Sequence, residues 1–267
     1  MTDSLDVLLN GLAGIETIVA GPDAAVRADV SREDRKGVPE VIMADRKRPV
    51  DVIDAARAFL DARGRAILSR VPDAMLDLLR SRFGECRIEA YPTSGMVVLK
   101  RPGFVGPSTG GRVAVLTAGS SDLPVAEEAQ VIAVEMGCDV IAAYDVGVAG
   151  IHRLAQPLRA IRERQSDVVI VAAGMDGALP SVVCGLVDVP VIGLPTPVGY
   201  GLGGNGVAAL MTMLQTCAPG LTVVNIGNGV GAGATAALIA NRVAAARGSI
   251  APDMIGVDDV GIDEVGI

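Results

Sequence analysis

Five short apolar runs that alternate with helix-compatible stretches constrain the fold of this chain more than any other feature. They are RVAVLT (112–117), DVIAAY (139–144), DVVIVAAG (167–174), PVIGLPT (190–196) and LTVVNIG (221–227). Each run is rich in β-branched residues, and a stretch with helical spacing follows it. The alternation predicts an α/β fold: a doubly wound, three-layer domain whose mostly parallel sheet is covered by helices on both faces.

The residues before this pattern predict a smaller α+β domain over residues 1–105. Helical spacing and strand-like runs are mixed there, and the predicted elements are helices over Ser4–Leu12 and Pro49–Ala62 and strands over Arg65–Val71 and Met96–Lys100. The charged segment Asp29–Arg48 is interpreted as an ordered loop or edge strand, with a solvated connector as the alternative.

Two stretches set the limits of the second domain. The run RPGFVGPSTGG (101–111) is rich in Gly and Pro and predicts a linker, so the second domain is placed at residues 106–245. Residues 246–267 are acidic, carry glycine at intervals and lack a helical period. They predict a disordered acidic tail.

The composition excludes several classes of protein. Of the 267 residues, 50% are hydrophobic, which suffices for a sizeable core. A net charge of -8 and an aromatic content of 2% argue against a nucleic-acid-binding protein, because such proteins use basic patches and stacking side chains. No stretch has the apolar length of a membrane span, and the N-terminus lacks a basic secretion signal. We therefore expect a cytoplasmic protein that does not contact a membrane.

The four cysteines indicate neither a zinc site nor a disulfide framework. Cys86, Cys138, Cys184 and Cys217 are widely spaced, with no C-x-x-C pair and no Cys/His cluster. An arbitrary cysteine is usually buried and inert. Cys217 differs because it lies in a turn with Pro and Gly rather than in an apolar strand, which favours an exposed thiol.

The loop after the first predicted strand has the residues of an anion site. Ser120, Ser121 and Asp122 lie in a small-residue turn that opens a helix, where backbone N–H groups can bind phosphate. The alternative is that Ser121 or Asp122 only caps the helix. The loop after the third strand contains one charged residue, Asp176, which is either a cap or an acid/base group facing the cleft.

The loops after the other strands are also candidates for binding. His152, the sole histidine, lies beside Arg153 just past the second strand, where either side chain could meet a phosphate or carboxylate; a lone histidine is more often structural. The glycine-rich loop 195–206 predicts a lid or phosphate loop. The glycine-rich stretch 225–233 follows the last strand with no acidic residue some 20 positions on, which argues against a dinucleotide-binding dehydrogenase.

Taken in order, six motifs resemble the carboxylases of purine biosynthesis that act on aminoimidazole ribonucleotide. They are GSSDLP, the HR pair, AGMDGALPSVV, VPVIGLPT, the Met-x-Met-Leu-Gln run before APG, and the final NGxGAG, spread over about residues 110–245. Within that superfamily the chain is more similar to the LarB family of nickel-pincer cofactor biosynthesis. That likeness rests on SSDLPVAEEA, DVGVAGIHRL, CAPGLTVVNIGNG and RKGVPEVI, and it covers nearly the whole chain except the tail.

The resemblance implies a pyridinium-3,5-biscarboxylic acid mononucleotide synthase. Such an enzyme carboxylates the pyridinium ring of nicotinic acid adenine dinucleotide at C5 with CO2 or bicarbonate, through a cysteine adduct at C6. It also hydrolyses the phosphoanhydride to release AMP. The resemblance further implies Mg2+ for that hydrolysis, no tightly bound organic cofactor, and a homo-oligomer, which is an octamer in the purine relatives.

The resemblance also assigns residues. The nucleophile falls on Cys217 and the acidic residue near the ring on Asp176, where the family is expected to have Glu. A second departure is Gly227, where the family usually has Asp. The substrate-binding residues implied are Gly119, Ser120, Ser121, Asp122, His152, Arg153, Gly174, Met175, Gly201, Gly203, Gly204, Asn225 and Asn228.

Two other functions stay open at the level of sequence. One is the aminoimidazole ribonucleotide carboxylase or mutase reaction, against which stand the roughly 100 extra N-terminal residues and the presence of Cys217. The other is a non-catalytic nucleotide-binding relative, which the departures at Asp176 and Gly227 favour. Retention of the one cysteine that the carboxylation needs argues against lost chemistry.

Overall fold

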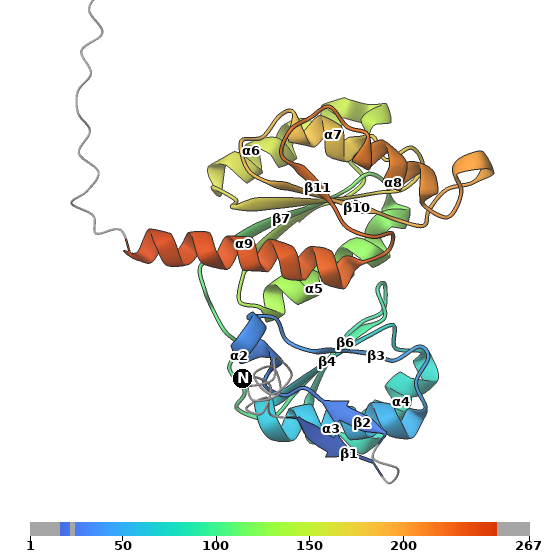
Figure 1. The fold of residues 1–267 in the computed structure, drawn as a ribbon, viewed down its shortest axis with the longest axis vertical. Helices are drawn as coiled ribbons and strands as arrows, with labels where there is room; N and C mark the ends of the chain where they lie inside the picture. Colours follow the sequence, from blue (N-terminus) through green and yellow to red (C-terminus); the bar gives the residue numbers. More distant parts are fainter. Residues whose placement is uncertain (1–16, 22–24, 250–267) are drawn as a thin grey trace, which may run out of the picture.

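The computed structural model describes residues 17–21 and 25–249, which form two sheet-based domains joined by a short connection (Figure 1). The predicted helix Ser4–Leu12 lies outside the described residues. So does the predicted tail from residue 250 onward, whereas residues 246–249 complete the last helix.

The second domain contains the predicted parallel sheet. Its strands are β7 (Arg112–Thr117), β8 (Asp139–Ala143), β9 (Val168–Ala173), β10 (Val191–Pro195) and β11 (Leu221–Val223). They lie in the order β11-β10-β9-β7-β8, and every neighbouring pair is parallel. The predicted fold class is confirmed. The last strand is shorter than predicted because the chain turns at Asn225, whose carbonyl accepts the N–H of Asn228.

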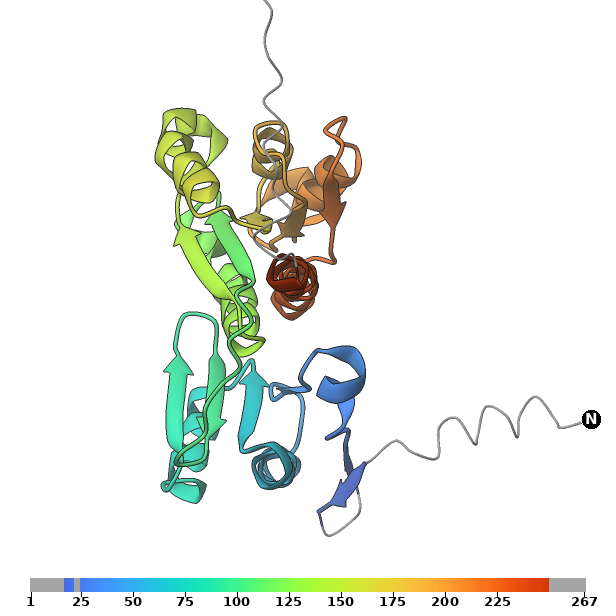
Figure 2. The same cartoon turned by 90° about the vertical axis from the view of Figure 1, so that its left-hand side faces the viewer.

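Helices cover both faces of this sheet, as the alternation predicts (Figures 1 and 2). One face carries α5 (Leu123–Glu135) and α9 (Gly229–Ser249), and the other carries α6 (Ala155–Glu163), α7 (Leu179–Cys184) and α8 (Val207–Leu214). Small residues let α5 and α9 approach closely. A Cβ added at Gly233 would lie 2.3 Å from the carbonyl oxygen of Ala129, so α9 needs glycine at this crossing.

The first domain is a four-stranded mixed sheet in the order β3-β4-β6-β5. These strands are β3 (Val41–Met43), β4 (Arg65–Ser69), β6 (Met96–Lys100) and β5 (Arg87–Tyr91), with helices α3 (Pro49–Arg63) and α4 (Asp73–Arg82) packed on one face. A separate pair, β1 (Ile18–Ala20) and β2 (Val26–Ala28), is antiparallel.

In the first domain the sequence predicted α3, β4 and β6, but β1, β2, α4 and β5 were not predicted. Strand β4 ends two residues early because Arg70 adopts a left-handed conformation, with φ of 55°, and the Val71 N–H bonds the Gly95 carbonyl. The charged segment 29–48 does contain an edge strand, β3, and also a short helix, α2 (Arg32–Lys36), that its charge pattern concealed. Arg35 and Arg32 both bond the Asp29 carboxylate, which ties this helix to the preceding turn.

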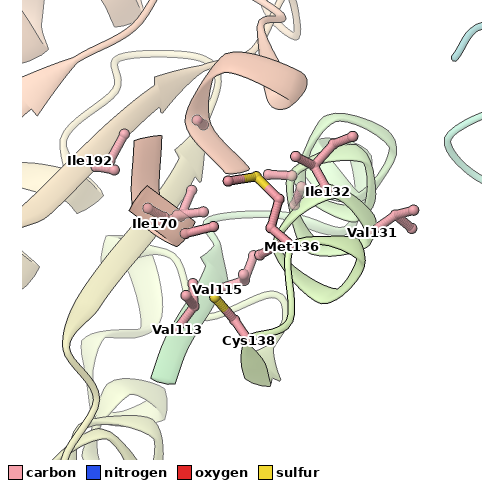
Figure 3. Close-up of a cluster of buried hydrophobic side chains, with 14 of the residues drawn as sticks. Val113, Val115, Val131, Ile132, Met136, Cys138, Ile170 and Ile192 are labelled. Carbon is pink, nitrogen blue, oxygen red and sulfur yellow. The ribbon is translucent and has the colours of Figure 1, made fainter. Parts of the chain in front are cut away.

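Helix α5 lies between the two domains and is apolar on both sides. Ile132 and Met136 turn toward Val115 and Ile170 of the sheet, while Val131 lies on the opposite side of the helix (Figure 3). The same buried cluster includes Ile67, Met96 and Val98 from the first domain. The hydrophobic core is therefore continuous across the domain boundary.

Buried polar contacts reinforce this junction. Glu135, at the end of α5, pairs with Arg65 at 3.0 Å and with Lys100 at 2.7 Å, and the Glu135 and Arg65 side chains are almost fully buried. One turn into α5, Glu128 accepts a hydrogen bond from the Ser69 hydroxyl and another from the Val230 N–H at the start of α9. The first domain thus holds α5 near both of its ends.

Candidate functional site

The strand order places a cavity where two connections leave the sheet in opposite directions. After β7 the chain crosses to β8 on one side, and after β9 it crosses to β10 on the other, so the loops diverge between β7 and β9. Ligands of open parallel sheets bind at such a point. A cavity of about 220 Å³ lies here, and the predicted site residues that line it are Gly119, Ser121, Asp122, Arg153, Gly174, Met175 and Asp176.

The loop after β7 is held by Asp122. Its carboxylate is buried and accepts the Gly119 N–H at 2.8 Å and the Thr196 hydroxyl at 2.5 Å. Both carboxylate oxygens are therefore engaged in positioning loops, and Ser121 is left to face the cavity. Thr196 was not identified from the sequence, since a threonine that ends an apolar run has no distinguishing pattern.

The loop after β9 passes very close to the end of β10. The Met175 N–H bonds the Val198 carbonyl at 2.7 Å, and a Cβ added at Gly174 would lie 2.4 Å from that same oxygen. Asp176 follows with an exposed side chain. Among the described residues, its carboxylate accepts one long hydrogen bond, of 3.4 Å, from the Ala178 N–H. A bond this long is a weak helix cap. The Asp176 side chain lines the cavity.

Arg153 enters the cavity from the connection between β8 and α6. It lies in a 3-10 turn, Val148–Leu154, and its guanidinium pairs with Asp145 at 2.8 Å. Asp145 is itself fixed, because its N–H bonds the Thr117 hydroxyl at 3.0 Å. Sequence reasoning missed this aspartate, although a carboxylate directly after an apolar strand is a usable signal. His152 is exposed and does not line the cavity.

The remaining predicted binding residues do not reach this cavity within one chain. Ser120 lies in the adjoining turn, and Gly201, Gly203 and Gly204 belong to the loop after β10, which projects outward with Leu202 fully exposed. Asn228 accepts the Gly231 N–H at 2.9 Å and so caps α9, while the Asn225 side chain bonds the next N–H. Gly227 has φ of 66°, a conformation that glycine adopts without strain.

Cys217 is the one exposed thiol of the four. Burial raises the pKa of Cys86 and of Cys184, and it raises the pKa of Cys138 to about 11. A thiol is nucleophilic as the thiolate, so these three are protected and poorly reactive. The exposure expected for Cys217 from its turn is therefore observed.

Cys217 and Asp176 lie at opposite edges of the sheet. The turn that contains Cys217 leads into β11, and the Gly220 carbonyl accepts the N–H of Val191 at the start of β10. Asp176 instead follows the end of β9. A five-residue strand spans about 13 Å, so the two side chains do not meet within one chain.

Neither a metal cluster nor a membrane span is found in the described part of the chain. Residues 17–21 and 25–249 contain no group of three His, Cys, Asp or Glu side chains that could hold a metal ion. Across those same residues, no helix combines the length and apolarity needed to cross a membrane.

Comparison with known proteins identifies both domains. Residues 112–255 match the family model AIR carboxylase, and residues 23–101 match the LarB/PurE-like N-terminal domain. An uncharacterized protein of Methanocaldococcus jannaschii is 40% identical over 220 residues, which cover 80% of this chain and 84% of that protein.

Enzymes named as ribonucleotide mutases match about half of the chain. The N5-carboxyaminoimidazole ribonucleotide mutase of M. jannaschii is 31% identical over 134 residues, or 50% of this chain and 78% of that enzyme. The enzyme of the same name from Thermotoga maritima is 32% identical over 135 residues, or 48% and 74%. With its matched N-terminal domain, the chain belongs to the AIR carboxylase family as a LarB-like member.

Proposed function

We propose that this protein carboxylates the pyridinium ring of nicotinic acid adenine dinucleotide at C5 and hydrolyses the phosphoanhydride to release AMP. This would be the first step of nickel-pincer cofactor biosynthesis. The observation that carries the proposal is the single exposed thiol, Cys217, in a carboxylase fold that is preceded by a LarB/PurE-like domain. A carboxylation that starts from a pyridinium needs a nucleophile of this kind.

The thiolate of Cys217 adds to C6 of the ring and forms a C–S bond. The electron pair displaced from the ring makes C5 nucleophilic, and C5 then attacks the carbon of CO2. A base removes the proton from C5, and the electrons of that C–H bond re-form the C5–C6 double bond while the C–S bond breaks and thiolate leaves. Thiolate suits both steps because it is a good nucleophile and a competent leaving group.

Asp176 is the proposed base, and Arg153 the proposed anion ligand. Asp176 is exposed at the cavity with one weak hydrogen bond, so its carboxylate is free to accept a proton. Arg153 is oriented by Asp145 and can bind a phosphate beside Ser121. Because no metal-binding cluster is found among the described residues, a Mg2+ ion would have to rely on the substrate's phosphates for ligands.

We propose further that each active site is completed by a second copy of the chain. The cavity, about 220 Å³, is small for a dinucleotide, and Cys217 lies at the other edge of the sheet. Large apolar side chains are exposed between these places, namely Tyr200, Leu202, Val207, Met211 and Leu214. Exposed apolar surface of this extent is typical of an interface. A homo-oligomer that buries it can bring Cys217 of one copy to Asp176 of another.

The N5-carboxyaminoimidazole ribonucleotide mutase reaction is the second candidate. The match of the second domain to enzymes of that name favours it. The matched N-terminal domain and the exposed Cys217 favour the pyridinium reaction instead, because the mutase relatives match only about half of this chain.

One assay distinguishes these functions. The purified protein is incubated with nicotinic acid adenine dinucleotide, bicarbonate and Mg2+, and products are identified by mass spectrometry. We expect AMP and a dicarboxylated mononucleotide; N5-carboxyaminoimidazole ribonucleotide is supplied in a parallel reaction. Turnover of the purine substrate alone would establish the second candidate, and turnover of neither would support a non-catalytic relative.

A further inference from the structure

A second and larger cavity, of about 850 Å³, lies at the amino edge of the five-stranded sheet. Its walls come from α6, the start of β9, the loop between α7 and β10, and the end of α9, which Figure 2 views end-on. The length of β9 separates it from the carboxyl-edge cavity, because Ser166 and Asp167 precede that strand and Gly174 follows it. Its volume is in the range of small-molecule sites.

The charges of this cavity favour an anion. Three guanidinium groups and two carboxylates line it, and Asp167 is already committed to Arg247 at 2.8 Å and to the Arg112 N–H at 2.8 Å. Arg159 and Arg162, one turn apart on α6, have no ion pair within the described residues. Two guanidinium groups one turn apart, neither of them paired with a carboxylate of the described residues, match a phosphate group.

The other lining residues suit the uncharged part of a ligand, since they offer both hydrogen-bonding groups and an apolar wall. Ser166 is 5% exposed, and its hydroxyl has no hydrogen-bond partner among the described residues. Such a group is costly unless something bonds to it. Asp188 offers a second acceptor, and the apolar part of the wall consists of Leu158, Ile161, Leu186, Val187 and Val189.

We propose that the amino-edge cavity binds a nucleoside monophosphate at a site separate from the active site. Arg159 and Arg162 hold the phosphate, Ser166 and Asp188 bond hydroxyls of the ribose, and the base packs on the apolar wall. This site does not depend on the pyridinium reaction, since none of its residues is assigned a role there.

Isothermal titration calorimetry with AMP tests the site, with adenosine and inorganic phosphate as comparison ligands. AMP is also a product of the proposed reaction, so binding is measured in the Arg153→Ala variant, in which the carboxyl-edge site is weakened. We expect AMP to bind there, and to bind at least about tenfold more weakly when Arg159→Ala and Arg162→Ala are added.

Matched variants make the result specific. Arg46→Ala removes a guanidinium that is 93% exposed elsewhere on the chain, and it should leave AMP binding unchanged. Ser166→Ala should weaken AMP binding without lowering thermal stability, since the hydroxyl has no partner among the described residues to lose. No AMP binding to Arg153→Ala, or equal AMP affinity with and without Arg159 and Arg162, would overturn the proposal.

Discussion

The carboxyl edge of the five-stranded sheet holds a small cavity with Arg153 and Asp176, whereas the amino edge holds the Cys217 turn and a larger cavity. At the carboxyl edge, the loops are fixed by buried hydrogen bonds, such as that from Thr196 to Asp122. At the amino edge, the Cys217 thiol and the guanidinium groups of Arg159 and Arg162 are exposed, and no buried hydrogen bond holds them within the described part of the chain.

One chain therefore supplies the residues for both halves of the proposed chemistry but does not bring them together. In the proposed mechanism, the anion ligand Arg153 is oriented by its pair with Asp145, whereas the base, Asp176, is held by one long hydrogen bond. The proposed nucleophile, Cys217, would then come from another copy of the chain. The first domain holds α5 in place through Ser69 and Arg65, and α5 spans the sheet from one edge to the other.

The strongest test of this comparison is complementation between two inactive variants. Cys217→Ala and Asp176→Asn should each lose carboxylation on their own. If the two residues act from different copies, co-expression of both variants should restore on the order of a quarter of the wild-type rate, because random mixing leaves that share of sites with both groups intact. The rate is measured as AMP release.

Complete inactivity of the co-expressed variants, once mixed assembly is verified, would place both residues in one chain's site. Cys86→Ala serves as the control, since Cys86 is buried in the first domain and should not be needed for the rate.

The next largest effect is expected where the first domain holds the end of α5 at the amino edge. Arg65→Met removes one of the two cations paired with the buried Glu135 carboxylate. It should lower the free energy of unfolding by at most about 3–5 kcal/mol, because Lys100 remains as a partner. Arg101→Ala is the control, because its pair with Asp61 is exposed on both sides and should contribute at most about 1 kcal/mol. Urea denaturation measures both variants, and equal losses would show that the junction does not depend on this pair.

A smaller effect is expected at the carboxyl edge from Thr196→Val. The variant keeps the side chain's shape but removes the hydroxyl that bonds Asp122, leaving a buried carboxylate oxygen unpaired at a cost of about 1–3 kcal/mol. The Gly119 turn should loosen, and we expect KM to rise more than kcat falls. Thr222→Val, which removes a long bond to the Val191 carbonyl on β10, should leave KM unchanged.

The smallest effect is expected in the number of cysteine thiols that react with a thiol reagent. Native protein should react with Ellman's reagent at one thiol per chain at pH 8, and denatured protein at four. Raising the pH to 10 should not make Cys138 react, because its thiol is buried and burial raises its pKa to about 11, so most of it stays protonated. Reaction of two or more thiols in the native state would contradict the assignment of Cys217 as the only accessible one. Assembly that buries Cys217 should slow its reaction without adding another thiol.

The sequence predicted the architecture well because the relevant signals are local. Alternating apolar runs and helical spacing depend on residues close together in the chain, so β6 and β7 have the bounds predicted for them and α3 extends one residue further. The short helix α2 and the strand β5 were not predicted. A five-residue helix stabilised by Asp29 and a strand that is only partly buried lack a strong pattern of their own.

What the sequence determined by itself is the parallel α/β domain, the smaller domain before it, and the loops in which a site must be sought. Only the tertiary structure decided which polar groups meet. Asp122 and Thr196 are 74 residues apart, and Arg65 and Glu135 are 70 apart, so no local period encodes these contacts. The tertiary structure also put Cys217 and Asp176 at opposite edges. The reason is physical: contacts between distant segments depend on strand register and helix packing, which follow from burial of the whole core.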